Sequence, residues 1–300
     1  MAVETLDCIS LTVPDDALDY FESALSSVCR AVSFFQNEAE RSWDISAVKE
    51  RGAFETDLLS ALMIAEILTG YKATVTRSQV PVGGWLARTK AAFPEQRIGA
   101  RFVVRGTHIS APPIAGKIML TLDAGMAFGS GEHHSTRGCL VALEHVAKYR
   151  QPQKILDLGT GSGVLAIAAA KIYHRNILAT DIDARAARVA KANARLNGVA
   201  GEIRAIKADG WADKTIRRHA PYDMVFANIL ARPLCAMAHA LAASLAPNGI
   251  AILAGLLTTQ ANWVLSAHRR AGLVLERRIT DGAWTILVLR KGELVARRVG

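Results

Sequence analysis

The chain has 300 residues, of which 51% are hydrophobic and 21% are charged, and its formal net charge at pH 7 is +9. This length allows one large domain or two ordinary ones, and the composition is typical of a folded soluble protein. The sequence contains neither the roughly 18 consecutive apolar residues of a membrane span nor a signal peptide, so we expect a cytoplasmic protein. The four cysteines are scattered without CxxC spacing, which favours free thiols, and we expect no metal ion.

The charge is divided unevenly along the chain. Residues 1–97 hold 14 acidic and 9 basic residues, a balance of −5, and the remaining residues hold 13 acidic and 27 basic, a balance of +14. A basic protein often binds nucleic acid, but these basic residues are spread over expected helices and strand ends without interleaved aromatic residues. Solvated helix faces are the simpler interpretation, and an acidic front part also suits a substrate protein that is itself basic.

The first 80 residues follow the order strand, helix, strand, strand, helix, strand. Alternating apolar residues indicate the strands, and apolar residues at helical spacing indicate the helices. This βαββαβ order is typical of a ferredoxin-like α+β fold, a small sheet with both helices on one face. We interpret residues 1–82 as a recognition domain. The expected elements are residues 6–13, 17–28, 31–38, 42–50, 57–70 and 72–80.

A connecting segment is expected over residues 83–118. It begins with a short basic helical stretch between Gly83-Gly84 and Pro94, and short strands broken by Pro112-Pro113 follow. Gly and Pro at these points are typical of a linker between two modules.

From residue 154 onward, strands and helices alternate strictly. Such alternation predicts an α/β domain, with a doubly wound and mainly parallel sheet, over residues 119–300. Two final strands joined by Asp281-Gly282 are expected to form a hairpin that adds antiparallel pairing at the edge of this sheet. The expected parallel strands are residues 154–159, 176–182, 204–210, 222–230 and 249–257.

A glycine-rich turn follows the first of these strands, in the stretch QKILDLGTGSGVL. In open α/β sheets the ligand lies beyond the carboxyl ends of the strands, so Gly159, Gly161 and Gly163 are expected beside it. The dinucleotide fingerprint GxGxxG needs a third glycine where Val164 stands, and the phosphate-binding pattern GxxxxGK[ST] is absent. A turn of this kind also occurs as a purely structural joint, so other residues must identify the ligand.

Three carboxylates at the ends of successive strands supply that information. Asp157 would repel a pyrophosphate but would suit the ammonium group of an amino-acid moiety, directly or through water. Asp181 can accept hydrogen bonds from both hydroxyls of a ribose, and Asp209 can accept one from the amino group of adenine. S-adenosylmethionine combines these three groups without a phosphate. A nicotinamide cofactor is the weaker alternative.

With these features the chain resembles class I methyltransferases and, more narrowly, the family that methylates ribosomal protein L11 of the large subunit. Three stretches carry the resemblance: GMAFGSGEHHSTRGCL (residues 125–140), ILDLGTGSGVLAIAAAK (residues 155–171) and ANIL (residues 227–230). A small front domain and a connecting helix are similar too, so the match covers nearly the whole chain. The resemblance implies a Rossmann-like fold, S-adenosylmethionine as the cofactor and ribosomal protein L11 as the substrate.

The resemblance also implies site residues. Asn228 would be catalytic, because it would end the fourth strand beside the methyl group and its carbonyl oxygen could accept a hydrogen bond from the incoming amine. An asparagine that only caps the following helix is the alternative. Phe128 would pack beside the cofactor or substrate, or else in the core. The expected cofactor-binding residues are Thr136, Asp157, Gly159, Gly161, Asp181 and Asn228.

We therefore expect an enzyme that methylates lysine side-chain amino groups, and also the α-amino group, of ribosomal protein L11. A lysine of pKa ~10.4 must lose its proton first, which costs roughly 4–5 kcal/mol near pH 7. Burial and the nearby sulfonium lower that pKa, so a general base is not required. The alternatives are a methyltransferase for another protein lysine or for RNA, and a non-catalytic module that binds S-adenosylmethionine. We expect a monomer that needs no membrane and no direct contact with nucleic acid.

Overall fold

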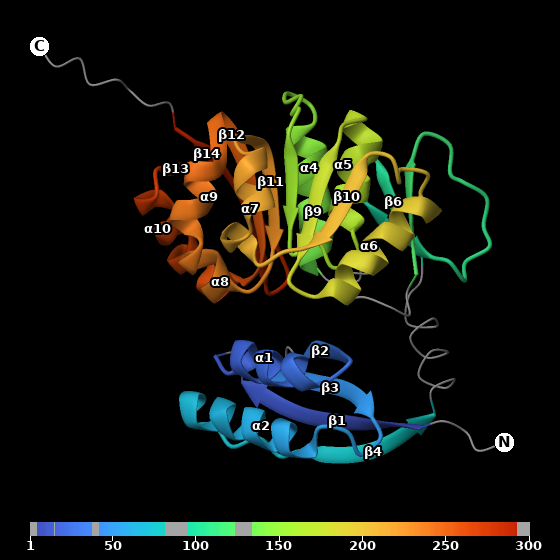
Figure 1. Cartoon of the computed structure of the whole chain (residues 1–300), viewed down its shortest axis with the longest axis vertical. Coiled ribbons are helices and arrows are strands. Elements are labelled where there is room, and N and C mark those ends of the chain that lie inside the picture. Colours follow the sequence, from blue (N-terminus) through green and yellow to red (C-terminus); the bar gives the residue numbers. More distant parts are fainter. Residues whose placement is uncertain (1–4, 15, 38–41, 82–94, 124–133, 293–300) are drawn as a thin grey trace, which may run out of the picture. The chain divides into compact units, whose positions relative to one another are not determined.

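The computed structural model of the chain describes residues 5–14, 16–37, 42–81, 95–123 and 134–292. The chain divides into two compact units, Met1–Ala92 and Phe93–Gly300 (Figure 1). Among the described residues, no helix is both long enough and apolar enough to cross a membrane.

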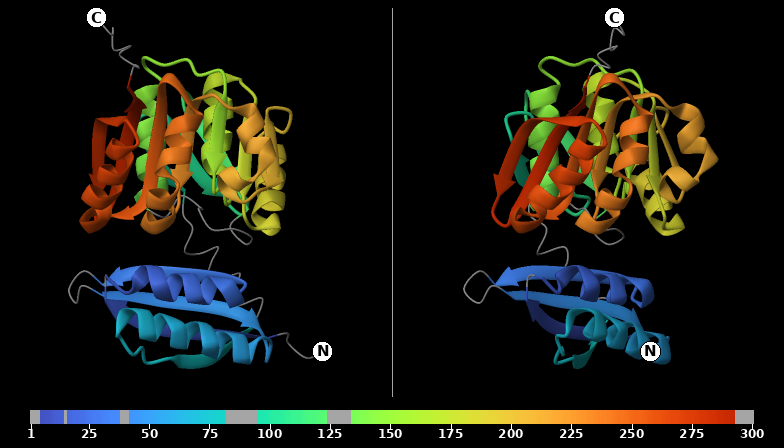
Figure 2. Two further views of the ribbon diagram at one scale, coloured as in Figure 1. Left: turned by 60° about the vertical axis from the view of Figure 1, so that its left-hand side comes forward. Right: turned by 90° about the vertical axis from the view of Figure 1, so that its left-hand side faces the viewer.

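The first unit is a four-stranded antiparallel sheet with two helices side by side on one face (Figure 2). Its strand order, β2-β3-β1-β4, places the first strand in the interior of the sheet. Ile9, Leu11 and Val13 are buried, because alternate residues of a strand point to the same face and the helices cover this face. The predicted α+β fold is confirmed. The elements are β1 (Thr5–Pro14), α1 (Leu18–Val28), β2 (Ala31–Asn37), β3 (Ser42–Glu50), α2 (Glu55–Thr69) and β4 (Thr76–Pro81).

A buried lysine ties α2 to the sheet of this unit. The Lys49 side chain is 1% exposed, and its ammonium group donates hydrogen bonds to Ala53 O at 2.7 Å and to Glu55 Oε1 at 2.6 Å. Asp7 Oδ2 lies 3.5 Å from the same nitrogen. A buried charge requires such partners, and here they hold the N-terminus of α2 against β1 and β3.

The second unit contains a seven-stranded sheet and a separate three-stranded sheet. Its strands are β5 (Gln96–Ile98), β6 (Phe102–Gly106), β7 (Ile118–Leu122), β8 (Ile155–Leu158), β9 (Ile177–Asp181), β10 (Ile203–Lys207), β11 (Tyr222–Asn228), β12 (Leu245–Leu257), β13 (Leu273–Asp281) and β14 (Trp284–Lys291). Its helices are α4 (His134–Val146), α5 (Val164–Tyr173), α6 (Ala184–Leu196), α7 (Lys214–His219), α8 (Ala231–Ala236), α9 (Ala238–Ser244) and α10 (Ala261–Arg270). Two short 3₁₀ turns are η1 (Gly210–Ala212) and η2 (Thr258–Gln260).

The large sheet has the strand order β10-β9-β8-β11-β12-β14-β13. Pairing is parallel from β10 through β12 and antiparallel for β14 and β13, so the predicted doubly wound sheet and terminal hairpin are confirmed. Within this hairpin, β14 pairs with β12 and β13 forms the edge of the sheet. The strict alternation of strands and helices predicts a single helix between β11 and β12, over residues 232–246, but the structure has two helices there, α8 and α9. They are separated by Met237, whose φ of −92° and ψ of 1° interrupt the helical geometry.

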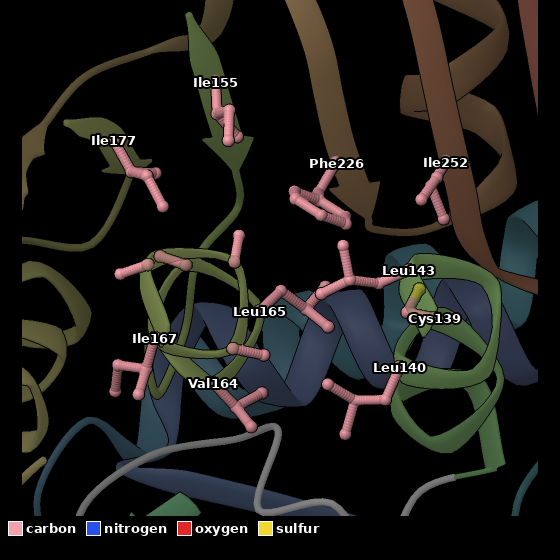
Figure 3. Packing of buried hydrophobic residues seen from close by; sticks show 14 of the residues in the cluster. Cys139, Leu140, Leu143, Ile155, Val164, Leu165, Ile167, Ile177, Phe226 and Ile252 are labelled. Atoms are coloured by element: carbon pink, nitrogen blue, oxygen red, sulfur yellow. The ribbon is translucent and has the colours of Figure 1, made fainter. Parts of the chain in front are cut away.

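One hydrophobic core of this unit lies between α4, α5 and one face of the large sheet, and a second core includes residues of the same strands and of α8 to α10. Figure 3 shows Leu143 of α4 and Leu165 of α5 near Phe226 of β11, with Ile252 of β12 beside them. Helix α5 is apolar on nearly all sides, as expected for a helix that is covered all round. This packing fixes the helix that begins at the glycine-rich turn.

The three-stranded sheet β5-β6-β7 belongs to the second unit. Asn197, at the end of α6, holds β7 in place, because its Oδ1 accepts a hydrogen bond from Thr121 N at 2.9 Å and its Nδ2 donates one to Thr121 O at 2.6 Å. Glu144 of α4 accepts a hydrogen bond from Ala100 N at 2.9 Å. β5 and β6 thus fall within residues 83–118, the expected connector, and pack with the unit that follows it.

Candidate active site

The glycine-rich turn connects β8 to α5 at the carboxyl edge of the large sheet. All three glycines have positive φ, +70° at Gly159, +51° at Gly161 and +84° at Gly163, which is a region that residues with a side chain rarely adopt. A Cβ atom on Gly159 would lie 2.4 Å from Ile229 Cγ2, and one on Gly163 would lie 3.0 Å from Ala190 Cα. Glycine is therefore required at 159 and 163 by neighbouring parts of the protein itself.

Asp157 lies beneath the turn and is 1% exposed. Its Oδ2 accepts hydrogen bonds from Thr160 Oγ1 at 2.6 Å and from Ala166 N at 3.2 Å, which ties the turn to the start of α5. Its Oδ1 is buried without a hydrogen-bond partner among the described residues. Burial raises the pKa of the Asp157 carboxyl to about 6, although the two hydrogen bonds oppose this shift.

This raised pKa gives a testable pH dependence. The folded chain binds a proton at Asp157 more tightly than the unfolded chain does, so this residue's contribution to stability is present at low pH. It is lost as the pH rises from about 4 to about 6, by at most about 3 kcal/mol. Asp157→Asn should remove this slope. Urea unfolding across that pH range, on the wild type and the variant, measures the difference, and identical slopes for the two proteins would contradict it.

Asp181 ends β9 and is joined to the turn. Its Oδ2 accepts a hydrogen bond from Gly161 N at 2.9 Å, and its Oδ1 accepts one from Asp183 N at 3.0 Å. Partial burial raises the pKa of the Asp181 carboxyl, while the backbone N–H groups lower it. A carboxylate has about four acceptor positions, so this one is held in place and keeps positions for a ligand with two hydroxyls.

Asn228 ends β11, the neighbour of β8 in the sheet. Its Nδ2 donates a hydrogen bond to Oγ1 of Thr136, at 3.2 Å. Thr136 lies in the first turn of α4 and is 1% exposed. Two of the three motif stretches found in the sequence therefore meet at this bond. Because the amide nitrogen of Asn228 donates to Thr136, Oδ1 is the atom of this side chain that can accept a hydrogen bond from a ligand.

Ile229 lies between a glycine of the turn and a glycine of β12. Its Cγ2 packs against Gly159 of the turn, and its backbone packs against Gly255 of β12. Gly255 has φ +79°, and a Cβ atom there would lie 2.5 Å from Ile229 O. Ile229 N also donates a hydrogen bond to Ala254 O at 3.2 Å. The segment that follows Asn228 is thus held on both sides by backbone that tolerates no side chain.

Two residues of this region were not expected from the sequence. Asn193 in α6 is fully buried, donates a hydrogen bond to Ser162 O at 2.8 Å and accepts one from Asp123 N at 3.0 Å. An asparagine on the apolar face of an amphipathic helix was the signal that could have identified it. Ile182 directly follows Asp181 and is 66% exposed, which is unusual for an isoleucine at a strand end.

The structure brings most of the expected site residues together. The Gly161–Asp181 hydrogen bond, the Asn228–Thr136 hydrogen bond and the Gly159–Ile229 contact join four elements at one edge of the sheet. Asp209 is exposed and directly precedes η1, after β10. Phe128 lies outside the described residues, as does the remainder of residues 124–133.

The comparison with protein families shows to which family the chain belongs. The model of the family described as ribosomal protein L11 methyltransferase (PrmA) matches residues 2–292. The chain belongs to this family. The family resemblance inferred from the three sequence stretches is therefore confirmed.

Individual relatives agree with the family model. A ribosomal protein L11 methyltransferase of Rhodopseudomonas palustris is 39% identical over 262 residues, which are 87% of this chain and 88% of the relative. A protein of the same name from Bradyrhizobium diazoefficiens is 49% identical over 191 residues, which are 64% of this chain and 65% of the relative.

A solved structure of the family shares the fold. The ribosomal protein L11 methylase of Lactobacillus delbrueckii subsp. bulgaricus superposes with a TM-score of 0.60 at 28% identity. The match covers 66% of this chain and 98% of that chain. The second unit thus has the class I methyltransferase fold, with the Rossmann-like sheet that the sequence predicted.

Proposed function

We propose that the chain transfers methyl groups from S-adenosylmethionine to lysine side-chain amino groups, and to the α-amino group, of ribosomal protein L11. Family membership supports the substrate, and the grouping of Asp181, Gly161, Asn228 and Thr136 at the carboxyl edge of a doubly wound sheet supports the chemistry. In this proposal residues 1–82 recognise the substrate, and residues 119–300 bind the cofactor and catalyse. Residues 83–118 connect the two parts and contribute β5 and β6 to the second unit.

The side chains at this edge fit S-adenosylmethionine. Asp181 would accept hydrogen bonds from the two ribose hydroxyls, and Ile182, exposed beside it, would pack against the adenine ring. Asp157 keeps Oδ1 without a partner among the described residues, which suits the attraction of the amino-acid ammonium group, directly or through water. Gly159 and Gly161 would bring the backbone close to the ligand.

The bound cofactor supplies an activated methyl group on a sulfonium, which is a good leaving group. The protein then has to hold a neutral amine in line with that methyl group at near-attack distance. Asn228 Oδ1 is suited to accept a hydrogen bond from the amine and so to direct its lone pair, because Thr136 already fixes the amide nitrogen. Thr136 is therefore a positioning residue for Asn228.

Asn228→Ala is expected to lower kcat by about a hundredfold and to change cofactor affinity by less than about threefold. The size of the effect is that of removing one aligned hydrogen-bonding group from an active site. Thr136→Val should lower kcat as well, because the amide loses its anchor. Asn262→Ala, at an exposed asparagine of α10, is the matched control and should leave both values unchanged. Steady-state kinetics measure kcat, and calorimetry with S-adenosylhomocysteine measures cofactor affinity. An unchanged kcat for Asn228→Ala would contradict the role of Asn228 in directing the amine.

Labelled S-adenosylmethionine, incubated with the chain and total ribosomal components, tests the proposal. Label on L11 lysines supports it. Label only on another protein, or on RNA, would replace it with one of the alternatives, and binding without transfer would indicate a non-catalytic module. The proposal also places a monomeric enzyme in the cytoplasm, where ribosomal proteins are made, and sedimentation and fractionation test these two points.

A further inference from the structure

Helix α6 packs against β9 and β10 at one end of the large sheet (Figure 1), and it carries a row of basic side chains that we name the α6 row. The members are three or four residues apart, so they lie on one side of the helix, and all are exposed. From residue 185 to residue 195 the row is about 15 Å long, at 1.5 Å per residue. Its residues are Arg185, Arg188, Lys191 and Arg195.

The positive charges of the α6 row are not balanced within the helix. Helix α6 contains no aspartate or glutamate. Its N-cap residue Asp183 lies 3.4 Å from Arg185. Among the described residues, no carboxylate lies within ion-pair distance of Arg188, Lys191 or Arg195. Like charges three or four residues apart repel each other and destabilise a helix, so this row reduces stability where a mixture of signs would not.

The first member of the row also opposes the helix dipole. The N-terminus of a helix carries a positive partial charge, so basic residues are favourable in the last turn and unfavourable in the first. Helix α10 follows this rule, since its two arginines are in its last turn. Helix α6 has Arg185 in its first turn and no acidic residue there. Stability of the fold therefore does not explain the row, and such departures from local rules are expected at functional sites.

A partner with closely spaced negative charges would remove the repulsion within the row. The phosphate backbone of a nucleic acid has such charges, and it needs cations rather than apolar contacts. Binding to a membrane surface would need large apolar side chains beside the basic ones. The exposed residue between Lys191 and Arg195 is instead Ala192, whose small side chain allows a phosphate backbone to come close, and Leu196 is the last residue of the helix.

We propose that the α6 row binds the phosphate backbone of RNA without reading its base sequence. Contacts from arginine and lysine to phosphates provide affinity that does not depend on sequence. RNA is a binding partner here and not the methyl acceptor, so the proposal does not depend on the proposed function. The row takes no part in the hydrogen bonds that join Asp181 to Gly161 and Asn228 to Thr136. Loss of its charges should therefore leave kcat and cofactor affinity unchanged.

The test compares two triple variants of the full chain. Glutamine replaces the basic residues, because it is a good helix former without a charge. The α6 variant combines Arg188→Gln, Lys191→Gln and Arg195→Gln. The matched control, the α7 variant, removes two arginines and one lysine from exposed positions of a helix that packs into the other hydrophobic core. It combines Lys214→Gln, Arg217→Gln and Arg218→Gln.

Fluorescence anisotropy with a labelled RNA duplex of arbitrary sequence, without methyl donor or L11, measures the affinity at several salt concentrations. The α6 variant should bind at least about tenfold more weakly. Its slope of log affinity against log salt should become shallower by about 2–3, because each lost phosphate contact lowers the slope by about 1. The α7 variant should bind within about threefold of the wild type, with its slope unchanged. The thermal unfolding midpoint of the α6 variant should not fall, because the repulsion within the row is relieved.

A second measurement needs no variant. In the wild type, RNA should slow the chemical acetylation of Lys191 and leave that of Lys154 unchanged, an exposed lysine directly before β8. Unchanged RNA affinity of the α6 variant, or equal losses in both variants, would overturn the proposal. So would tighter binding of the row to anionic vesicles or to polyaspartate than to RNA. RNA binding through α6 in a chain that does not methylate L11 would support the proposal and remove only the proposed function.

Discussion

Asp181→Ala should weaken the binding of S-adenosylmethionine by at least about a hundredfold. The carboxylate is positioned by Gly161 N and Asp183 N, at 2.9 and 3.0 Å, and would accept two charge-assisted hydrogen bonds from the ribose. Such bonds contribute about 1.5–3 kcal/mol each, and about 1.4 kcal/mol corresponds to a factor of ten in affinity. Calorimetry with S-adenosylmethionine and S-adenosylhomocysteine measures the change.

Asp183→Ala is the matched control for this experiment. Asp183 is also a carboxylate, two residues beyond the end of β9, but its side chain caps α6 by accepting a hydrogen bond from Arg185 N at 2.7 Å. Its loss should cost about 1 kcal/mol of stability and leave cofactor affinity unchanged, because only its backbone N–H contacts Asp181. If the two variants bound the cofactor equally well, Asp181 would not be the ribose ligand.

Gly159→Ala should destabilise the fold by about 2–5 kcal/mol. Alanine at φ +70° costs about 1–2 kcal/mol, and overpacking against Ile229 Cγ2 adds about 1–3 kcal/mol. Cofactor affinity should fall as well, because the turn has to move to relieve the clash. Urea unfolding measures the first effect and calorimetry the second.

A control variant and a double variant separate the cost of the backbone conformation from the cost of the clash with Ile229. Gly198 has φ +71°, and a Cβ atom added there would meet no described atom within 4 Å, so Gly198→Ala should show the backbone cost alone. Ile229→Ala removes the clashing methyl group, so the double variant Gly159→Ala/Ile229→Ala should recover about 1–3 kcal/mol relative to the sum of the single changes. If the two glycine variants lost equal free energies of unfolding, and the double variant recovered none, Gly159 would be needed only for its backbone conformation.

Local sequence patterns predicted most elements of the fold. Strands such as β1 and β8 are short runs of alternating or continuous apolar residues, and α6 has apolar residues at helical spacing; these periodicities depend only on near neighbours. Where the pattern was ambiguous the prediction was less accurate. β4 begins at Thr76, four residues later than expected, and the short helix α7 was not predicted.

Residue chemistry at strand ends also indicated the class of ligand. The carboxylates at positions 157 and 181, and the glycine spacing that excludes a pyrophosphate, can be read from neighbouring residues. The reason for the glycine at 159 could not be predicted from neighbouring residues, because the side chain that packs against it belongs to Ile229, which follows another strand.

The amino-acid sequence by itself determined the order and kind of the elements, the turn with its three glycines and the family, because each is encoded in residues close together along the chain. Only the tertiary structure decided which distant residues meet. The Asn228–Thr136 bond joins positions 92 residues apart, Ile229 is held between the turn and β12, and β14 is inserted between β12 and β13. These contacts depend on how helices and strands pack around the common core, and no local pattern specifies that packing.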